Sequence, residues 1–448
     1  MFQKFTFLVL FVIFPCFALA QSWSLISQLP APSSDINSIC VVDSNVIWVS
    51  CVGGYLYRST DGALTWQDKS PSVSLDLFGV SAIDSMSCWV GTSDGTVART
   101  TDGGSTWTPQ INIAGSYING IKMFDAQNGV FMGDDVGMGQ VYQLRYTTDG
   151  GDNWLLSSTS PQANNEYGII NAWDWTDQNH FWIGTQNYDQ NAPEVRLIHT
   201  VTGFQGTFTS INIQGEGGAN GLGIPAIAFT DSLHGIIGSR ASDSDFIKIT
   251  TDGGTSWETA DVPDSSSSFD IACANGLKDG SDIIRVLVAD FANSEFKLFR
   301  TTDYGTTWTE EMLPAEAAAN GFRQMEFLND SLGFAGCIGG YIIKYSTSQP
   351  SGVISTNITP SKFILNQNYP NPFNPTTLIS YSLPSSGNVS LKVYDVLGKE
   401  VKTLVNGFQQ AGLHSISFNA SALPSGVYFY RMEAANRFTS VKKMILLR

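Results

Sequence analysis

One pattern of eight residues recurs five times and constrains the fold more than any other feature of the chain. Each copy begins with Ser or Thr, has Asp at its third position and ends in Trp: STDGALTW (59–66), TTDGGSTW (100–107), TTDGGDNW (147–154), TTDGGTSW (250–257) and TTDYGTTW (301–308). A degenerate sixth copy, TVTGFQGTF (200–208), keeps the glycine but lacks the Asp and the Trp. Successive copies end 41 to 54 residues apart, a period typical of propellers and solenoids.

The residues of this pattern are those of a reinforced hairpin turn. The Asp carboxylate can accept hydrogen bonds from nearby amides and hydroxyls, Gly allows a positive φ, and Trp folds back as an apolar plug. The pattern resembles the Asp-box, or bacterial neuraminidase repeat, whose turns lie at the blade periphery, away from catalytic centres. We therefore predict a structural role, and no catalytic one, for ten residues: Asp61, Trp66, Asp102, Trp107, Asp149, Trp154, Asp252, Trp257, Asp303 and Trp308.

The segments between these turns predict an all-β fold of repeated four-stranded units. In IKMFDAQNGVFMG (121–133), for example, a strand, a turn and a second strand precede the third strand and its Asp turn. Six such units lie at 35–68, 75–108, 117–155, 167–209, 220–258 and 269–309. A seventh (320–347) lacks its outer strand, which SWSLISQL (22–29) can supply, closing the ring and removing an exposed sheet edge. We predict a seven-bladed β-propeller, with six or eight blades as alternatives.

Two composition shifts mark a second domain after the propeller. Residues 361–448 contain 9 Lys and Arg against 3 Asp and Glu, whereas the first 360 residues contain 15 against 37, and all 11 Trp lie at or before Trp308. The overall net charge of −16 argues against a nucleic-acid partner, because phosphate binding needs a basic surface. We predict a signal peptide (1–20), a propeller (21–347), a linker (348–361) and a C-terminal domain (362–448).

The N-terminus reads as an export signal. Lys4 precedes an apolar run from Phe5 to about Leu19, and the small-x-small triplet ending at Ala20 predicts cleavage between Ala20 and Gln21. This run is shorter than the roughly 20 residues that a spanning helix needs. An uncleaved anchor is the alternative. We expect an exported mature chain without a membrane span.

The C-terminal domain has alternating apolar and polar runs that predict a small antiparallel sandwich of about seven strands. Its motifs NYPNPFNPTT, VYDVLGKEV and LPSGVYFY and its basic end closely resemble the type A C-terminal sorting domain of type IX secretion cargo, itself similar to an immunoglobulin-like fold. The resemblance implies recognition by the outer-membrane translocon and delivery to the surface or medium of a Gram-negative bacterium. A permanent adhesive domain is the alternative. The residues that carry the sorting signal are Asn371, Pro372, Phe373, Asn374, Pro375, Gly398, Gly426, Tyr428, Lys442 and Lys443.

The five cysteines that remain after cleavage have no CxxC spacing, so we expect mostly buried thiols and no zinc site. Two acidic segments, Asp243-Ser244-Asp245 and Asp174–Asp177, match no calcium loop and are interpreted as solvated turns. No cofactor is expected.

The sequence does not indicate either of two enzyme classes that are built on such propellers, sialidases and xyloglucanases. A sialidase needs three arginines around a carboxylate, but Arg58, Arg99 and Arg300 precede their turns at one repeat position and are expected to be structural. A xyloglucanase of the paired-propeller type uses acidic residues in a cleft between two propellers, whereas one propeller is predicted here.

Aromatic residues recur where the first strand of a blade begins, and enlarged loops follow in the third and fourth blades. We predict a possible ligand face formed by Phe78, Tyr117, Tyr167, Tyr188, Phe269 and Phe322, with interblade packing as the alternative. The repeat also resembles that of photosystem II assembly factors, which are binding proteins. The function expected is a non-enzymatic propeller that binds a glycan or protein ligand or acts as a scaffold. The alternative is a secreted glycoside hydrolase.

Overall fold

The computed structural model describes residues 22–30, 35–72, 75–134, 136, 140–163, 166–187, 194–214, 222–240, 247–260, 262–263, 269–290, 295–346, 363–365, 368, 373, 375–421, 423–434 and 438–446. The chain divides into two compact units, and the second begins at Gly352. The predicted signal peptide with its Ala20–Gln21 cleavage site and the predicted linker (348–361) lie outside the described residues.

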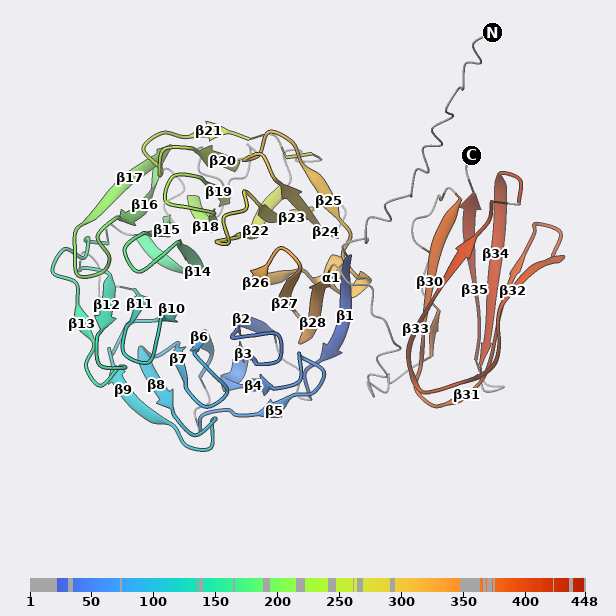
Figure 1. The fold of residues 1–448 in the computed structure, drawn as a ribbon, viewed down its shortest axis with the longest axis horizontal. Helices are drawn as coiled ribbons and strands as arrows, with labels where there is room; N and C mark the ends of the chain where they lie inside the picture. The colour runs from blue at the N-terminus through green and yellow to red at the C-terminus, as the bar shows by residue number, and fades with distance from the viewer. Residues whose placement is uncertain are drawn as a thin grey trace, which may run out of the picture. The chain divides into compact units, whose positions relative to one another are not determined.

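The first unit is a ring of seven four-stranded antiparallel blades, with the first strand of each blade innermost (Figure 1). Blade 1 contains β2 (Ile36–Val41), β3 (Ile47–Cys51), β4 (Leu56–Ser59) and β5 (Gln67–Asp68); blade 2 contains β6 (Leu77–Ala82), β7 (Cys88–Thr92), β8 (Thr96–Thr100) and β9 (Thr108–Asn112); blade 3 contains β10 (Ile118–Met123), β11 (Gly129–Gly133), β12 (Gln143–Thr147) and β13 (Leu155–Leu156). A 3₁₀ turn, η1 (Val52–Gly54), follows β3.

Blades 4 and 5 share an edge pairing between β15 and β18, so they form one eight-stranded sheet. Blade 4 contains β14 (Glu166–Trp175), β15 (Phe181–Asn187), β16 (Glu194–Thr200) and β17 (Phe208–Gln214); blade 5 contains β18 (Leu222–Phe229), β19 (Gly235–Arg240), β20 (Ile247–Thr250) and β21 (Glu258–Thr259); blade 6 contains β22 (Phe269–Gly276), β23 (Ile284–Asp290), β24 (Glu295–Thr301) and β25 (Thr309–Glu311). Helix α1 (Ala315–Asn320) leads into blade 7, which contains β26 (Phe322–Asn329), β27 (Leu332–Cys337) and β28 (Tyr341–Ser346).

The N-terminal strand closes the ring as predicted. β1 (Ser22–Gln28) pairs with β28 and supplies the fourth strand of blade 7. Trp23 is buried, with its ring centroid 5.4 Å from that of Tyr345 and 5.5 Å from that of Phe327. Its indole Nε1 donates a hydrogen bond of 2.9 Å to Glu311 Oε2 in blade 6. The seven-bladed, all-β architecture is therefore confirmed, and its last blade joins the two ends of the propeller sequence.

The Asp turns have the geometry predicted for reinforced hairpins. Asp102 Oδ1 accepts hydrogen bonds from the amides of Ser105 (3.0 Å) and Thr106 (2.9 Å), and Oδ2 accepts one from Thr106 Oγ1 (2.6 Å). Trp107 Nε1 donates to Lys69 O (3.0 Å), so this turn also joins blade 2 to blade 1. The box residues thus stabilise backbone within and between blades.

The degenerate sixth copy preserves this turn without a carboxylate. Thr202 stands where the other copies have Asp, and its Oγ1 accepts a hydrogen bond of 2.9 Å from the Thr207 amide. Phe208 replaces the Trp and contacts Phe204, with ring centroids 5.1 Å apart. In this copy a hydroxyl therefore accepts one of the amide hydrogen bonds that the Asp carboxylate accepts in the other copies.

The second unit is a sandwich of two sheets. One has the order β29-β30-β33, with β29 (Ile364–Leu365), β30 (Thr376–Leu383) and β33 (Gly412–Asn419); the other has the order β32-β31-β34-β35, with β31 (Gly387–Tyr394), β32 (Glu400–Gln409), β34 (Gly426–Ala434) and β35 (Phe438–Leu446). Residues of both sheets share one core, which includes Leu391, Tyr430 and Phe418. The small sandwich predicted from alternating runs is confirmed.

The predicted sorting residues that the structure describes have packing and turn roles. Phe373 and Tyr428 are buried in the sandwich core, Gly398 has a φ of 80° in the turn between β31 and β32, and Gly426 begins β34. Pro375 is exposed, and Lys442 and Lys443 lie on β35. Asn371, Pro372 and Asn374 lie outside the described residues.

The five cysteines are buried thiols outside disulfides, as expected. Burial raises the pKa of the Cys40 thiol to about 12, so it is protonated at neutral pH. Within the described part of the chain, none of the helices is both long and apolar enough to span a membrane.

Candidate ligand-binding site

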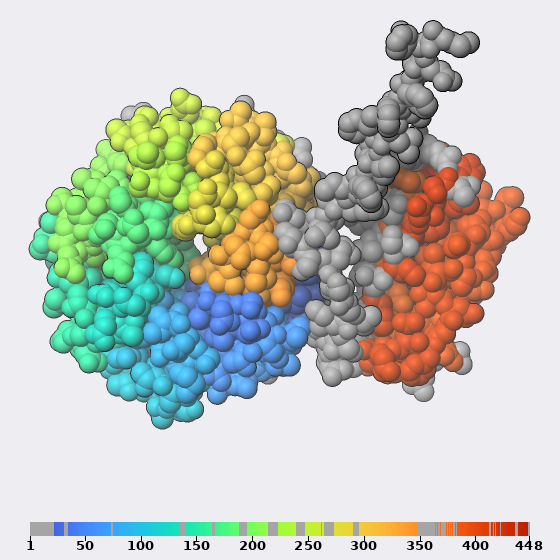
Figure 2. All heavy atoms as spheres, viewed as in Figure 1, coloured from blue at the N-terminus to red at the C-terminus, as the bar shows by residue number. Residues whose placement is uncertain are grey.

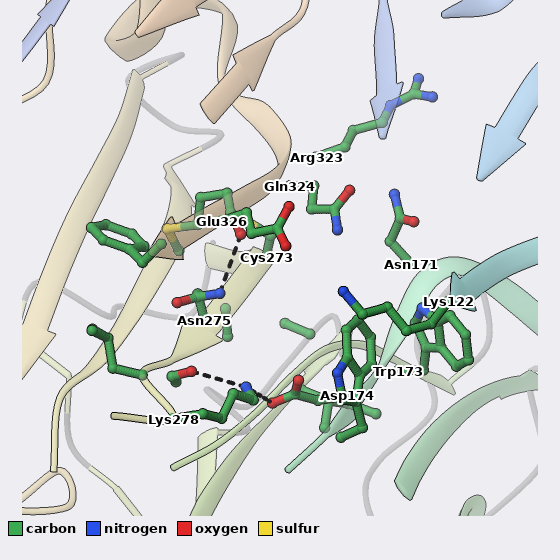
Figure 3. Close-up of a pocket in the computed structure, with 18 of the residues that line it drawn as sticks. Lys122, Asn171, Trp173, Asp174, Cys273, Asn275, Lys278, Arg323, Gln324 and Glu326 are labelled. Atoms are coloured by element: carbon green, nitrogen blue, oxygen red, sulfur yellow. Dashed lines mark hydrogen bonds and ion pairs between the residues drawn. The ribbon is translucent and has the colours of Figure 1, made fainter. Parts of the chain in front are cut away.

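A cavity of about 300 Å³ lies among the innermost strands of blades 3 to 7. Figure 2 shows an opening near the centre of the ring, and Figure 3 shows the side chains that line the cavity. Nine polar or charged side chains contribute to the lining: Lys122, Asn171, Asp174, Asn275, Lys278, Asp279, Arg323, Gln324 and Glu326. The walls therefore combine three carboxylates, two ammonium groups, one guanidinium and three amides.

Four of these residues occupy one position of the repeat. In blades 1 to 6 the residue just before the end of the innermost strand pairs with the second residue of the next strand, so the sheet register identifies equivalent positions. In β26 the equivalent residue is Glu326, because Phe327 pairs with Gly333 as Met123 pairs with Gly129. We call this the inner position. In blade order it holds Cys40, Ser81, Lys122, Asp174, Ala228, Asn275 and Glu326.

The inner position links neighbouring blades through the backbone. Four of its side chains accept a hydrogen bond from an amide at the end of the next innermost strand: Cys40 Sγ from Ala82 (3.3 Å), Ser81 Oγ from Met123 (2.8 Å), Asp174 Oδ2 from Phe229 (2.7 Å) and Glu326 Oε2 from Val41 (2.7 Å). Since a thiol and a hydroxyl make the same contact as the two carboxylates, the contact is a structural feature of the ring.

Of the carboxylates at the inner position, Asp174 is buried and Glu326 is half-buried, and each has a cation nearby. Lys278 Nζ lies 2.9 Å from Asp174 Oδ2 and also donates to Gly276 O at 2.9 Å. Burial raises the pKa of Asp174, and Lys278 offsets only part of this shift. Burial likewise raises the pKa of Glu326, and the charge of Lys122 opposes it.

Lys122 and Asn275 depart from the acceptor pattern. The Lys122 ammonium makes no hydrogen bond or ion pair with any described residue, and it lies 5.0 Å from the ring centroid of Trp175. Asn275 Nδ2 donates to Met325 O at 3.2 Å, while its buried Oδ1 accepts no hydrogen bond within the described structure. One donor group and one acceptor group in the cavity wall are thus unpaired.

A hydrogen-bond network at the other end of β26 involves blades 1, 2, 4 and 7. The Arg323 guanidinium donates to Asn37 Oδ1, and Asn171 Nδ2 donates to Asn37 O at 2.6 Å. Asn37 Nδ2 in turn donates to Leu77 O at 3.0 Å. Figure 3 shows Arg323 directed away from Asp174 and Lys278. Its guanidinium is therefore engaged with the protein rather than directed at the cavity.

The arginines at the repeat position before the Asp turns join blades to one another. Arg58 donates to Ser85 O of the next blade, Arg99 Nη1 lies 3.6 Å from Asp152 Oδ1, and Arg300 Nη2 lies 3.4 Å from Asp330 Oδ1. Arg285 is fully buried and bonds Glu311 at 3.0 Å. Arg323 is the one arginine among the described lining residues, so no triad of arginines surrounds this cavity.

The ten box residues are absent from the described lining of the cavity. Hydrogen bonds from the side chain and amide of Thr106 lower the pKa of Asp102 to about 2, and those from Ser256 lower the pKa of Asp252 to about 2. The pKa values of Asp149 and Asp303 are lowered by the same kind of contact, and in Asp61 such contacts outweigh the opposing effect of burial. These carboxylates are held ionised in their turns.

The aromatic residues predicted to form a ligand face are not among the lining residues. Phe78, Tyr117, Tyr167, Phe269 and Phe322 lie at or near the starts of innermost strands, whereas the inner position lies near the strand ends. Tyr117 and Tyr167 are 48% and 37% exposed, and Phe78 lies 6.1 Å from Tyr117. Phe322 is buried against Trp23, 6.4 Å away, and is not available to a ligand. Tyr188 and the side chain of Phe269 lie outside the described residues.

Tyr117 lines a second, separate hollow with Ser93, Asp94 and Asn112. Asn112 Nδ2 already donates to Thr96 Oγ1 at 2.7 Å, and Asp94 accepts from Thr92 Oγ1 at 2.5 Å. Because these polar groups are engaged with the protein, the axial cavity is the stronger candidate site.

Sequence reasoning missed the inner position because its residue types differ from blade to blade. A second Asp turn, between the first and second strands, gives the register: Asp125 Oδ1, for example, accepts the amides of Gln127 and Asn128, each at 2.7 Å. Counting back from this turn would have found Lys122. The interpretation of Asp174 as part of a solvated turn was wrong, since its side chain is buried within β14. Asp243–Asp245 lies outside the described residues, and among those described no group of three or more metal-binding side chains occurs.

Residues 367–447 match the model of the secretion system C-terminal sorting domain. This match confirms the predicted type IX sorting domain and marks the chain as secretion cargo. The full sequence finds no match among curated proteins.

Three solved structures share the propeller fold. YCF48 bound to D1 peptide has a TM-score of 0.55 and 17% identity, over 74% of this chain and 99% of that chain. YCF48 from Cyanidioschyzon merolae has a TM-score of 0.52 and 16% identity, over 72% and 98%. A GH74 xyloglucanase from Xanthomonas campestris has a TM-score of 0.52 and 10% identity, over 81% of this chain but 60% of that chain. Identities this low establish the fold alone.

Proposed function

We propose that this chain is an exported, non-enzymatic binding protein whose propeller holds its ligand in the axial cavity. The C-terminal sorting domain would direct it through the type IX translocon to the cell surface or the medium. The signal peptide predicted at residues 1–20 would take it first to the periplasm. A ligand-binding role is supported by the size of the cavity, which is at the lower end of the range for small-molecule sites.

The observation that carries this proposal is the engagement of the two inner-position carboxylates with backbone. Glycoside hydrolysis uses two carboxyl groups, one as acid and the other as base or nucleophile. Here Asp174 and Glu326 each accept an amide of the next blade, in the place where other blades use Cys40 and Ser81. Asp174 is also paired with Lys278. This arrangement favours a structural role over a catalytic one.

The similar structures are compatible with binding and with catalysis. One of them is YCF48 bound to a peptide, and another is a xyloglucanase of which this chain spans 60%. A secreted glycoside hydrolase therefore stays the alternative function, with Asp174 and Glu326 as the residues to test.

A glycan array and a panel of fluorogenic glycosides, run on the same full-length mature protein, test the proposal. We expect no turnover of any glycoside. Turnover that disappears in Glu326→Gln or Asp174→Asn, but persists in Asp102→Asn, would establish the hydrolase instead. Asp102→Asn is the matched control because it neutralises a carboxylate in the periphery of the same propeller.

A further inference from the structure

We propose that the axial cavity binds a neutral sugar residue. This inference rests on the proposed binding function and specifies its ligand.

The charged groups of the cavity balance one another. Lys278 is paired with Asp174 at 2.9 Å, and the charges of Lys122 and Glu326 influence each other. Arg323 is engaged by Asn37 and directed away. Asp279 accepts hydrogen bonds from the amide and the hydroxyl of Ser281. An anionic ligand would meet three carboxylates, and a cationic ligand would meet two ammonium groups and a guanidinium, so the electrostatics favour a ligand without net charge.

The unpaired groups suit hydroxyls. Lys122 offers N–H donors without a protein partner among the described residues, and Asn275 Oδ1 is a buried acceptor without a donor there. A buried polar atom without a partner costs free energy unless a ligand or water satisfies it. Each hydroxyl group both donates and accepts, so neighbouring hydroxyls of one sugar ring can satisfy an ammonium and an amide oxygen together.

An apolar surface lies beside these groups. The Trp175 ring contacts the Lys122 ammonium and is part of the cavity lining. A sugar ring presents C–H groups on its faces and hydroxyls at its edge, which matches a site with an aromatic face and a few placed polar groups. A cavity of about 300 Å³ can hold one sugar residue at the end of a glycan, but it is too small for a folded protein.

Titration calorimetry on the full-length mature protein tests the inference. The probes are glucose, galactose, mannose, N-acetylglucosamine and their disaccharides, with glucuronic acid as the charged sugar and glycylglycine as the peptide. We expect at least one neutral sugar to bind, and Lys122→Met to weaken that binding about tenfold or more, because it removes a charged hydrogen-bond donor. Lys344→Met is the matched control: Lys344 Nζ also lies over an aromatic ring, 5.3 Å from that of Phe334, but outside the cavity lining.

The outcomes separate this inference from the proposed function. If no neutral sugar binds the wild-type protein, or if binding is the same in Lys122→Met, the inference is overturned. If only glycylglycine or glucuronic acid binds, and this binding is lost in Lys122→Met, the cavity keeps a binding function. The proposal of a neutral sugar as its ligand is then overturned. Release of a product from a bound disaccharide would keep the sugar and overturn the non-enzymatic role. Should Lys122→Met fail to fold, Asn275→Leu removes the unpaired acceptor and is expected to weaken binding in the same way.

Discussion

The carboxylates at the rim of the propeller and those around its axis make the same kind of contact under opposite conditions. At the rim, Asp102 accepts amides and hydroxyls of its own turn at an exposed site, and its pKa falls to about 2. At the axis, Glu326 accepts an amide from the next blade inside the ring, and burial raises its pKa. The difference shows that an acidic side chain can be structural at both places, while solvent decides whether its charge is favoured.

The largest effect expected from this comparison is on stability at the axis. Glu326→Ala removes the acceptor of the amide of Val41, a buried residue, so we expect a loss of about 1–3 kcal/mol in the free energy of unfolding. Urea unfolding measures this loss. Glu326→Gln keeps an acceptor oxygen and should recover most of it, and Asp102→Ala should cost less because water can solvate its exposed amides. Equal stability of Glu326→Ala and the wild type would show that the contact has no structural value.

The pH dependence of stability should have opposite signs at the two places. Carboxyls of the unfolded chain titrate near pH 4. The lowered pKa of Asp102 and Asp252 means that their contribution is present above about pH 4 and is lost as the pH falls towards 2. The raised pKa of Asp174 and Glu326 means that their contribution is most favourable below pH 4 and declines as the pH rises through the folded-state values.

Urea unfolding between pH 2 and pH 8 separates these contributions by substitution. Asp102→Asn with Asp252→Asn should reduce the loss of stability between pH 4 and pH 2, and Asp174→Asn should reduce the decline above pH 4. If both variants change the same part of the profile, the distinction between rim and axis fails.

The smallest effect concerns the degenerate turn of blade 4. Thr202 accepts the Thr207 amide through a hydroxyl, and Thr202→Asp would restore a second acceptor oxygen at this position. We expect a gain of about 0.5 kcal/mol in the free energy of unfolding, the lower value for one added hydrogen bond. The midpoint of thermal unfolding is a sufficient measurement, with Thr202→Val as the variant that should lose stability. This turn has nine residues, one more than the other copies. A loss of stability in Thr202→Asp would mean that the longer turn no longer places its amides where a carboxylate can accept them.

The fold could be predicted because its information is local and repeated. The Asp and Trp of each box lie five residues apart, and the same contact recurs in five blades, as in the turns of Asp102 and Asp252. Ring closure could also be predicted. The unit that begins at residue 320 lacks one strand, and the strand that begins at residue 22 belongs to no other unit, so the second can complete the first.

The candidate site could not be predicted in the same way because its residues meet only when the ring closes. Lys122, Asn275 and Glu326 come from three blades and share no residue type, so no spacing in the sequence joins them. Their common property is the sheet register. The aromatic residues predicted to form a ligand face recur at the starts of strands. At least one of them, Phe322, packs against Trp23 instead of facing a ligand. A repeated residue indicated the scaffold, whereas the polar lining varied from blade to blade.

The pairing of β1 with β28 has a consequence for when this protein can become folded. Residues 22–28 can pair only after residues 341–346 have been synthesised, because β28 is the strand next to β1 in the last blade. More than 300 residues of synthesis therefore separate β1 from the other three strands of its blade. Contacts so distant along the chain form slowly, since loop-closure entropy opposes them. A nascent chain therefore stays an open arc, with an unsatisfied strand edge at each end, until almost the whole propeller has been made.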